Sequence, residues 1–359
     1  MRVGSQDQLY ELEVLMSMTP SDTPANPLMQ MLQMMNGLWL TQCIGVAAQL
    51  EIADHLIDGA KSVEILAKAT CVDAQSLYRL LRALASSGIF AETEPRHFQL
   101  TSLADCLRSD APNSIRGLAI WTAIAPAHWG AWGNLLYSVK TGKPAFEQFT
   151  GMPIFEYFGQ NPDAAAIFDQ AMTSASAMFN PAIAYAYDFS WINTLVDVGG
   201  GQGALLVAIL QANPHLKGIV YDLPHVVAGA APYLEKWGLQ QRCQAIGGNF
   251  LEAIPEGGDA YILKNTLTNW DDDHAIQILK NCYRAMPQSG KLLIAQSVIE
   301  PGNSRDLGKF TDLEMLLMTA GGHERSLAEF EQVLNAAGFQ LSRTLPTQCP
   351  SSIIEAIKP

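Results

Sequence analysis

The chain has 359 residues, of which 48% are hydrophobic and 16% charged, and this composition excludes a disordered protein. Lysine and arginine number 22 against 35 aspartates and glutamates, so the formal charge is −13. A protein that binds phosphate backbones needs a basic face, so this charge argues against nucleic acid as the main partner. At about 150 residues per domain, the length fits about two domains.

Cysteine usage and hydropathy bear on the cellular compartment. Six cysteines are spread along the chain without a C-x-x-C pair, which is typical of a reduced intracellular protein rather than a disulfide scaffold or a zinc ribbon. Residues 1–20 have no unbroken apolar core of a signal peptide. No apolar run reaches the ~20 residues of a membrane-spanning helix. We therefore expect a cytoplasmic protein without a membrane partner.

The N-terminal part begins with polar residues and continues with helical periodicity. Residues 1–27 contain prolines and many polar residues, and we expect a flexible N-terminus there. Apolar residues then recur at helical spacing through Met29–Met35 and Leu38–Leu50. Methionine is an adaptable gap-filler, so this stretch predicts a helix that packs in a core or a dimer interface.

Residues 28–110 have the element order of a winged helix. Ser62 and Asp73 are suited to cap two successive helices, and His97–Leu100 reads as a strand of a small hairpin. A winged helix suggests DNA binding, but the second predicted helix offers only two arginines on one face. With the charge of −13, dimerisation is the better interpretation.

The rest of the chain changes from helices to alternating elements. Residues 111–190 read as helices rich in aromatic residues, which form either ordinary core or the wall of a pocket for a flat apolar ligand. Beyond them, β-rich runs alternate with helices such as Ala204–Ala212 and His274–Met286, which predicts a mostly parallel sheet in an α/β fold. The expected strands are Thr194–Val198, Lys217–Tyr221, Asp259–Leu263, Lys291–Ala295 and Ser352–Ile357.

A glycine-rich loop follows the first of these strands. Glycines at 199, 200, 201 and 203 lead into a helix, and they also match the dinucleotide fingerprint G-x-G-x-x-G/A. Asp197 precedes the loop, where its charge opposes a pyrophosphate but suits a cationic ligand. Asp222 ends the next strand, where a carboxylate accepts ribose hydroxyls of either cofactor. The loop thus favours S-adenosylmethionine over NAD without excluding NAD.

Five motifs occur in order: LVDVGGGQG (195–203), YDLPH (221–225), GGNF (247–250), LKNTLTNWDD (263–272) and GGHERS (321–326). Together they resemble the dimeric small-molecule O-methyltransferases of plants and bacteria, the family that includes caffeate and hydroxyneurosporene O-methyltransferases. The resemblance covers roughly residues 28–357. It implies a Rossmann-like class I methyltransferase sheet with an N-terminal α-helical winged-helix dimerisation domain, and hence a homodimer.

The resemblance also implies a domain organisation and a set of binding residues. The domains are a flexible 1–27, a winged-helix dimerisation domain 28–110, connecting helices 111–190 that form part of the acceptor pocket, and an S-adenosylmethionine-binding domain 191–359. The implied cofactor residues are Ser176, Gly199, Gly201, Asp222, Leu223, Asn249, Phe250, Lys264 and Trp270. Asn249 departs from the aspartate usual in the family. The expected acceptor residues are Trp129, Phe168, Met172, Asn269 and Met315.

The catalytic pattern of the family is incomplete in this chain. The family's histidine base belongs two residues before Trp270, where this sequence has Thr268. Its first acidic partner is replaced by Gln296, and only the second is kept, as Glu324. A general base contributes about 10²–10⁴-fold, whereas alignment of reactants contributes ~7–11 kcal/mol. The sequence therefore predicts methyl transfer to an activated oxygen, nitrogen or carbon nucleophile.

Other residues compete for the role of the base. His323 adjoins Glu324, and His128 lies in the aromatic stretch, but packing or capping is the plainer interpretation of His128. The acidic residues Asp271–Asp273 read as a solvated helix start rather than a metal site. Two further hypotheses remain: a non-methylating enzyme that performs cyclisation, rearrangement or hydroxylation on this scaffold, and a binding or regulatory protein.

Overall fold

The computed structural model describes residues 26–111 and 114–359, so the predicted flexible N-terminus lies almost wholly outside the described residues. The chain divides into two compact units, residues 1–42 and 43–359. The boundary falls inside helix α2 (Pro27–Gln49), which the apolar periodicity predicted. Along the first part of this helix, Met34 and Trp39 expose most of their surface.

The unit of residues 43–359 opens with short helices and a small antiparallel sheet. Its elements are α3 (Ile52–His55), β1 (Lys61–Ser62), α4 (Val63–Thr70), α5 (Ala74–Ser86), β2 (Phe90–Glu94), β3 (His97–Leu100) and α6 (Ser102–Asp105). The strands pair in the order β1-β3-β2. Ser62 and Asp73 cap α4 and α5 as predicted, because their side chains accept hydrogen bonds from the backbone three residues on.

A layer of helices follows, as the sequence predicts for residues 111–190. These helices are α7 (Arg116–Ile124), α8 (Pro126–Gly133), α9 (Leu135–Thr141), α10 (Ala145–Thr150), α11 (Ile154–Gln160) and α12 (Pro162–Ala186). A later helix, α17 (Gly308–Met318), joins this layer. Its residues Leu317 and Met318 share a buried cluster with Ala127 of α8 and Phe146 of α10. Side chains from α17 therefore meet side chains from α8.

The main sheet has seven strands in the order β6-β5-β4-β7-β8-β10-β9. Their bounds are β4 (Thr194–Val198), β5 (Lys217–Asp222), β6 (Cys243–Gly247), β7 (Ala260–Lys264), β8 (Lys291–Ser297), β9 (Gln340–Pro346) and β10 (Ser351–Ile357). The pairs from β6 to β8 are parallel, and β10 pairs antiparallel with both β8 and β9. The mostly parallel sheet and the α/β class are thus confirmed.

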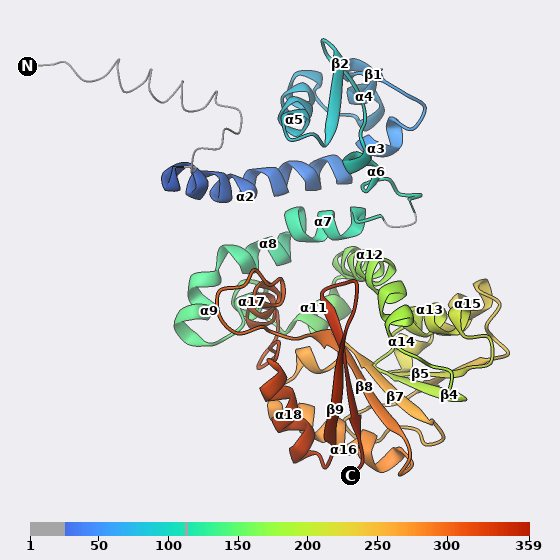
Figure 1. The fold of residues 1–359 in the computed structure, drawn as a ribbon. Coiled ribbons are helices and arrows are strands. Elements are labelled where there is room, and N and C mark those ends of the chain that lie inside the picture. The colour runs from blue at the N-terminus through green and yellow to red at the C-terminus, as the bar shows by residue number, and fades with distance from the viewer. Residues whose placement is uncertain (1–25, 112–113) are drawn as a thin grey trace, which may run out of the picture. The chain divides into compact units, whose positions relative to one another are not determined.

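Helices cover both faces of this sheet (Figure 1). They are α13 (Ala204–Ala212), α14 (Pro224–Val227), α15 (Ala230–Lys236), α16 (Asp272–Ala285) and α18 (Leu327–Ala336). Along β7, Ile262 packs with α12, α13 and α15, whereas its neighbours Tyr261 and Leu263 pack with α16 and α18. This alternation follows the two-residue period of a strand buried on both faces.

The topology identifies one place on the sheet as a binding edge. The chain runs from β4 outward to β5 and β6, and then returns to the other side of β4 with β7 and β8. In open α/β sheets, ligands bind at the carboxyl ends of the strands where the order reverses. The glycine loop, the end of β5 and the loop after β7 all lie at that edge.

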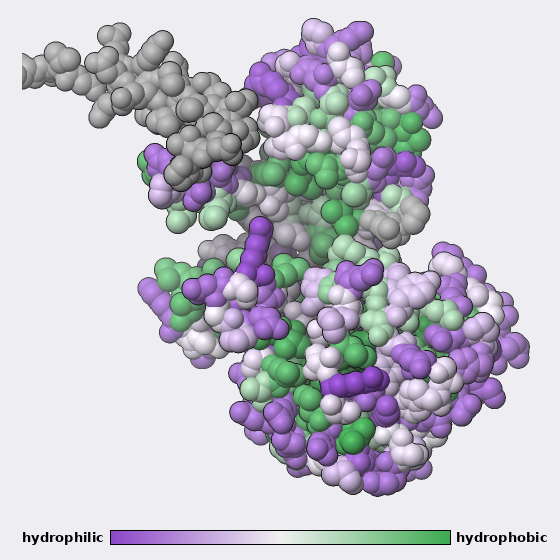
Figure 2. Space-filling view, viewed as in Figure 1, coloured by the Kyte–Doolittle hydropathy of each residue, from purple (hydrophilic) through white to green (hydrophobic). Residues whose placement is uncertain are grey.

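The surface of the described chain is mixed in character. In the face that Figure 2 presents, hydrophilic residues cover much of the sheet-containing part, with smaller apolar patches between them. Within residues 26–111 and 114–359, no helix is both long and apolar enough to cross a lipid bilayer. All six cysteines lie in the described ranges, and each is a free thiol.

Candidate active site

The glycine loop forms a tight turn between β4 and α13. The backbone N–H groups of Gly199 and Gly200 donate to the Tyr221 carbonyl oxygen at 2.8 and 3.3 Å. A Cβ on Gly199 would lie 2.9 Å from the Thr266 side chain, so only glycine fits there. Gly201 has φ +60° and open space around its missing Cβ. The loop therefore presents bare backbone to the open edge of the sheet.

A buried carboxyl group with one oxygen that lacks a hydrogen-bond partner lies beneath this loop. Asp197 is 1% exposed, and its Oδ2 has no hydrogen-bond partner in the described part of the chain. Burial raises the pKa of Asp197 to about 7, although the positive charge of Lys264 works against that rise. Lys264 donates to the Ser176 hydroxyl at 3.3 Å, and burial lowers its own pKa. A buried acid with an unpartnered oxygen, beside an open glycine loop, fits the cationic methionine end of S-adenosylmethionine.

The carboxylate that ends β5 is fixed by the backbone around it. Asp222 Oδ2 accepts from the Gly201 N–H at 2.9 Å, and Oδ1 accepts from the Leu223 N–H at 2.7 Å. Leu223 itself is 38% exposed. The structure thus brings three predicted cofactor residues, Gly201, Asp222 and Leu223, together at one edge of the loop.

The remaining predicted cofactor residues lie on neighbouring loops. Phe250 and Trp270 meet edge to face, with their ring centroids 6.0 Å apart. Asn249 accepts from the Leu251 N–H and donates to Glu252 Oε1. Its side chain therefore stabilises its own turn in this structure, where the family usually has an acid.

The three positions of the family's catalytic histidine and its acidic partners lie close together in the fold. Gln296 Nε2 donates to Glu324 Oε2 at 3.0 Å, and Thr311 Oγ1 donates to Glu324 Oε1 at 3.2 Å. Burial raises the pKa of Glu324, although the hydrogen bonds from these two donors lower it. Among the described atoms, Thr268 Oγ1 and Gln296 Oε1 are buried without a hydrogen-bond partner. The site therefore has free polar atoms but no histidine at this position.

Arg325 holds this part of the site in place. It is fully buried, and its guanidinium contacts Asp272 Oδ1 at 2.8 and 3.0 Å. It also donates to the carbonyl oxygens of Leu267 and Trp270, both at 3.0 Å. The loop that carries Thr268 is thereby fixed to the segment that carries Glu324. Sequence reasoning missed this role, because the partners lie more than fifty residues away.

His323 does not join the cluster around Glu324 through its ring nitrogens. Its Nε2 lies 3.4 Å from Asp272 Oδ1, and its Nδ1 lies 3.1 Å from the Gly321 carbonyl oxygen. Asp271 caps α16 by accepting from the His274 N–H at 2.9 Å. The interpretation of the acidic triplet as a helix start is thus confirmed.

The expected acceptor residues fall into two groups. Phe168 belongs to an aromatic cluster, stacked on Phe158 with centroids 4.7 Å apart and edge-on to Trp121 at 5.3 Å. Trp129 and Met172 are 38% and 39% exposed. Of the other two, Asn269 donates to the Asn265 carbonyl oxygen in the loop after β7, and Met315 is half-buried on α17.

A polar group that the sequence did not predict adjoins this aromatic cluster. Glu314, next to Met315 on α17, accepts from His128 Nε2 at 2.9 Å and from Trp132 Nε1 at 2.6 Å. The ring of His128 lies against that of Trp121, with centroids 4.7 Å apart. His128 was only a weak candidate in the sequence, and no local pattern links it to a glutamate 186 residues away.

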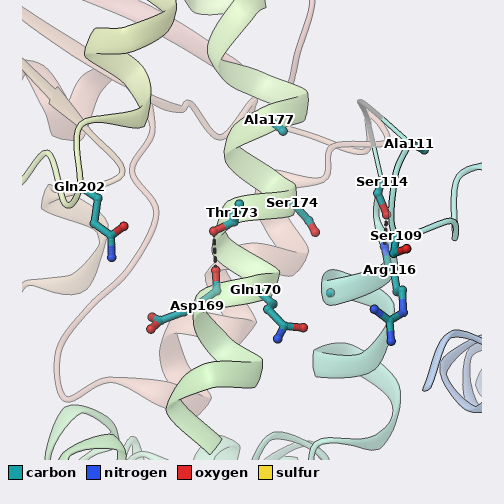
Figure 3. Close-up of a pocket in the computed structure, with 11 residues that line it drawn as sticks. Ser109, Ala111, Ser114, Arg116, Asp169, Gln170, Thr173, Ser174, Ala177 and Gln202 are labelled. Atoms are coloured by element: carbon teal, nitrogen blue, oxygen red, sulfur yellow. Dashed lines mark hydrogen bonds between the residues drawn. The ribbon is translucent and has the colours of Figure 1, made fainter. Parts of the chain in front are cut away.

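A pocket of about 550 Å³ with a largely polar lining lies against α12 (Figure 3). Its lining residues are Ser109, Ala111, Ser114, Arg116, Gly117, Asp169, Gln170, Thr173, Ser174, Ala177 and Gln202. Gln202 belongs to the glycine loop, so the pocket reaches the predicted cofactor edge. None of the five expected acceptor residues is among those lining residues.

Comparison with known proteins gives two family matches. Residues 132–340 match the O-methyltransferase domain, and residues 32–110 match the O-methyltransferase dimerisation domain. A phenazine O-methyltransferase from Lysobacter antibioticus is 43% identical over 326 residues, which cover 91% of this chain and 95% of that protein. An 8-amino-8-demethylriboflavin N,N-dimethyltransferase from Streptomyces davaonensis is 33% identical, with 94% and 97% covered.

The fold agrees with solved structures over nearly the whole chain. The crystal structure of LaPhzM is similar with a TM-score of 0.87 at 43% identity, covering 93% of this chain and all of that one. The relatives of this chain are therefore enzymes that transfer methyl groups to oxygen or nitrogen. The site described above, with the contact between Gly199 and Tyr221, the Asp197 carboxylate and the neutral Thr268, belongs to a chain with such relatives.

Proposed function

We propose that this chain, which belongs to the O-methyltransferase family and is an S-adenosylmethionine-dependent methyltransferase, methylates a small aromatic or polyketide-like metabolite. The acceptor atom is an oxygen, nitrogen or carbon that is nucleophilic without a protein base. The observation that carries this proposal is the combination of an intact cofactor edge with Thr268 and Gln296 in place of the base and its first acidic partner. The relatives named above act on phenazine and flavin ring systems, which supports a fused aromatic acceptor.

The cofactor residues divide by the chemistry of their side chains. Asp197 would face the cationic end, and Asp222 would accept hydrogen bonds from the ribose hydroxyls. The bare backbone at Gly199 and Gly201 allows the methionine part to approach closely. Lys264 and Ser176 would stand on the methionine side. On the opposite side, the adenine would be enclosed by Leu223, Asn249, Phe250 and Trp270. When bound, S-adenosylmethionine supplies a methyl group already activated by a sulfonium.

The acceptor side of the site works by positioning. Thr268 Oγ1 and Gln296 Oε1 are the buried polar atoms left free to bind the reacting group. Glu324 fixes Gln296 by a hydrogen bond, so that the amide oxygen keeps one orientation. Positioning alone contributes ~7–11 kcal/mol in favourable cases. An amine, an acidic phenol or an enol fits this arrangement, whereas a plain alcohol does not.

We also propose that the enzyme acts as a homodimer in the cytoplasm, without nucleic acid or membrane as a partner. The match of residues 32–110 to the dimerisation domain supports the dimer. The winged-helix order of elements then serves assembly rather than DNA binding, in line with the charge of −13. The free thiols of all six cysteines, each in the described ranges, support a reducing compartment.

Calorimetric titration with S-adenosylhomocysteine, with NAD as the control ligand, tests the cofactor assignment. We expect micromolar binding of the first and no heat from the second. A panel of hydroxy- and amino-substituted phenazines and naphthalenes, incubated with S-adenosylmethionine, then tests methyl transfer by mass. Tight cofactor binding without any methylated product would favour the non-methylating alternative, and absence of binding by a folded sample would contradict the whole assignment.

A further inference from the structure

We infer that His128, held by Glu314 and Trp132, is a specificity-determining residue that accepts a hydrogen bond from a second hydroxyl or amino group on the acceptor. The inference rests on the proposed function and deepens it, because it adds a polar requirement to an otherwise aromatic site. It concerns the chemistry of the acceptor and not the transfer step itself.

The first step of the argument is the tautomer of His128. The Glu314 carboxylate accepts hydrogen bonds, so the Nε2 that lies 2.9 Å from it carries the proton. Trp132 Nε1 is a donor only, and its bond to the other oxygen of Glu314 at 2.6 Å keeps the carboxylate in place. In the neutral ring, Nδ1 then bears a lone pair and acts as a hydrogen-bond acceptor.

The second step is that this lone pair is left over. His128 is 3% exposed, and its Nδ1 is buried without a hydrogen-bond partner anywhere in residues 26–111 and 114–359. A buried acceptor without a partner is unfavourable, because it has lost its hydrogen bonds to water and gained none in the protein. The side chains of Glu314 and Trp132 thus fix the orientation of a ring nitrogen whose hydrogen bond is not made within the described residues. An incoming O–H or N–H donor would complete it.

The third step is the location of the group. The His128 ring lies against Trp121, and Trp121 lies against Phe168, the aromatic residue expected in the acceptor pocket. On α17, Glu314 lies three residues, or about one helical turn, from Thr311. Thr311 in turn donates to Glu324 in the catalytic cluster. The group therefore adjoins the aromatic cluster of Phe168, and its Glu314 shares helix α17 with Thr311, whose hydroxyl reaches Glu324.

This placement predicts the acceptor's class. A molecule with its reacting group near Thr268 would present a second donor group to Nδ1 from the far ring of a fused ring system. Nδ1 is buried in the ligand-free protein, so this contact requires the entering acceptor ring to displace aromatic side chains around Phe168. A site that hydrogen-bonds a substrate hydroxyl can reject the analogue without it by a factor of about 10⁴ in the best cases. Here we expect an acceptor without the second donor to bind at least about tenfold more weakly, because its other contacts with the aromatic side chains are apolar and stay the same.

The test uses 2,7-dihydroxynaphthalene, with 2-naphthol and 7-methoxy-2-naphthol as analogues that lack the second donor. Each is titrated by calorimetry into the full-length enzyme saturated with S-adenosylhomocysteine, and kcat/KM is measured with S-adenosylmethionine. We expect the diol to bind at least about tenfold more tightly than either analogue. In His128→Phe, which keeps a ring against Trp121, the three ligands should bind alike. The matched control His215→Phe, at an exposed histidine, should retain the preference.

A second measurement is independent of turnover. In protein with ¹⁵N-labelled histidine, the NMR signal of His128 should show an unprotonated Nδ1 and should shift when the diol is added but not with 2-naphthol. Equal binding of the three ligands by the wild type, a protonated Nδ1, or absence of any shift would overturn the inference. Methylation of 2-naphthol as fast as of the diol would overturn it while leaving the proposed function intact. A wild type that binds no S-adenosylhomocysteine would instead contradict the proposed function.

Discussion

Two carboxyl groups in the site, Asp197 and Glu324, have raised pKa values for the same reason, which is burial. They differ in what compensates them. Glu324 accepts hydrogen bonds from Gln296 and Thr311, whereas Asp197 Oδ2 lacks a partner among the described residues. The first acid is therefore satisfied by the protein, and the second is left for a ligand. This difference supports a positioning role for Glu324 and a ligand-binding role for Asp197.

Replacement of Asp197 by asparagine should remove cofactor binding and stabilise the ligand-free enzyme. An acid whose pKa is raised in the folded state stabilises that state fully at pH values below its unfolded pKa of ~4. This stabilisation is lost as pH rises through about 7, the pKa of Asp197 in the folded protein. At about pH 8 the neutral amide should therefore unfold later in urea, by on the order of 2 kcal/mol. Equal stability of the two proteins at that pH would contradict the buried-charge argument.

The same carboxyl should make cofactor affinity depend on pH. Asp197 gains a charge as pH rises through about 7, so the affinity for the cationic ligand should rise over that interval. Calorimetry with S-adenosylmethionine in buffers of different ionisation enthalpy should detect proton release on binding below that pH. An affinity that stays constant, or that falls as pH rises, would show that Asp197 does not face the ligand's positive charge.

Thr268→His should raise the rate with weakly acidic phenols and leave acidic phenols nearly unchanged. A general base adds about 10²–10⁴-fold when well placed, and we expect about tenfold because the site was not built around it. Glu324 is positioned to accept from the new imidazole. The kcat for a phenol and for its nitro-substituted analogue would be compared in the two proteins. No gain, in a variant that still binds S-adenosylhomocysteine, would mean that the acceptor's reacting group lies elsewhere.

At the scale of single elements, the central strands were predictable and the edge strands were not. β4, β7 and β8 are buried on both faces, so each appears in the sequence as an apolar run. β6 and β9 lie at the two edges and expose most of their side chains, so no apolar run marks them. Burial, rather than strand propensity, decided which strands the sequence revealed.

Helix α18 depends on a reciprocal cap at its start. Ser326 Oγ accepts from the Glu329 N–H, and the Glu329 carboxylate accepts from the Ser326 N–H at 2.7 Å. Ser326→Ala should lower the free energy of unfolding by about 1 kcal/mol, measured by urea denaturation. The hydrogen bonds from Ser326 lower the pKa of Glu329, so the loss should be larger at neutral pH than in acid. A loss that grew on acidification would contradict this cap.

For the whole molecule, the family motifs predicted the candidate cofactor edge, because each motif is one short continuous segment of the chain. The motif positions fixed Asp222, Gly201 and Trp270 without any knowledge of distant contacts. The polar group of His128 and Glu314 was not predictable, because it depends on α17 packing near α8. Contacts that join residues far apart in sequence leave no local pattern to read.

Ligand binding should stabilise the molecule as a whole. A ligand that binds only the folded state adds ~2.7 kcal/mol at a concentration of 100 times its Kd. S-adenosylhomocysteine should therefore raise the melting temperature, and NAD should not. Asp222→Ala serves as the comparison, because it removes the carboxylate expected to bind the ribose and should abolish the shift. A rise with NAD of the same size would point to a dinucleotide site instead.

The position of β10 sets an order on the closure of the sheet. β9 precedes β10 in the chain, yet its only pairing among the described strands is with β10, which lies between β9 and β8. Before Ser351–Ile357 is in place, β9 therefore has no neighbouring strand, and β8 has one open edge. A partly folded molecule without β10 thus exposes two unpaired strand edges, which are templates for pairing with other chains.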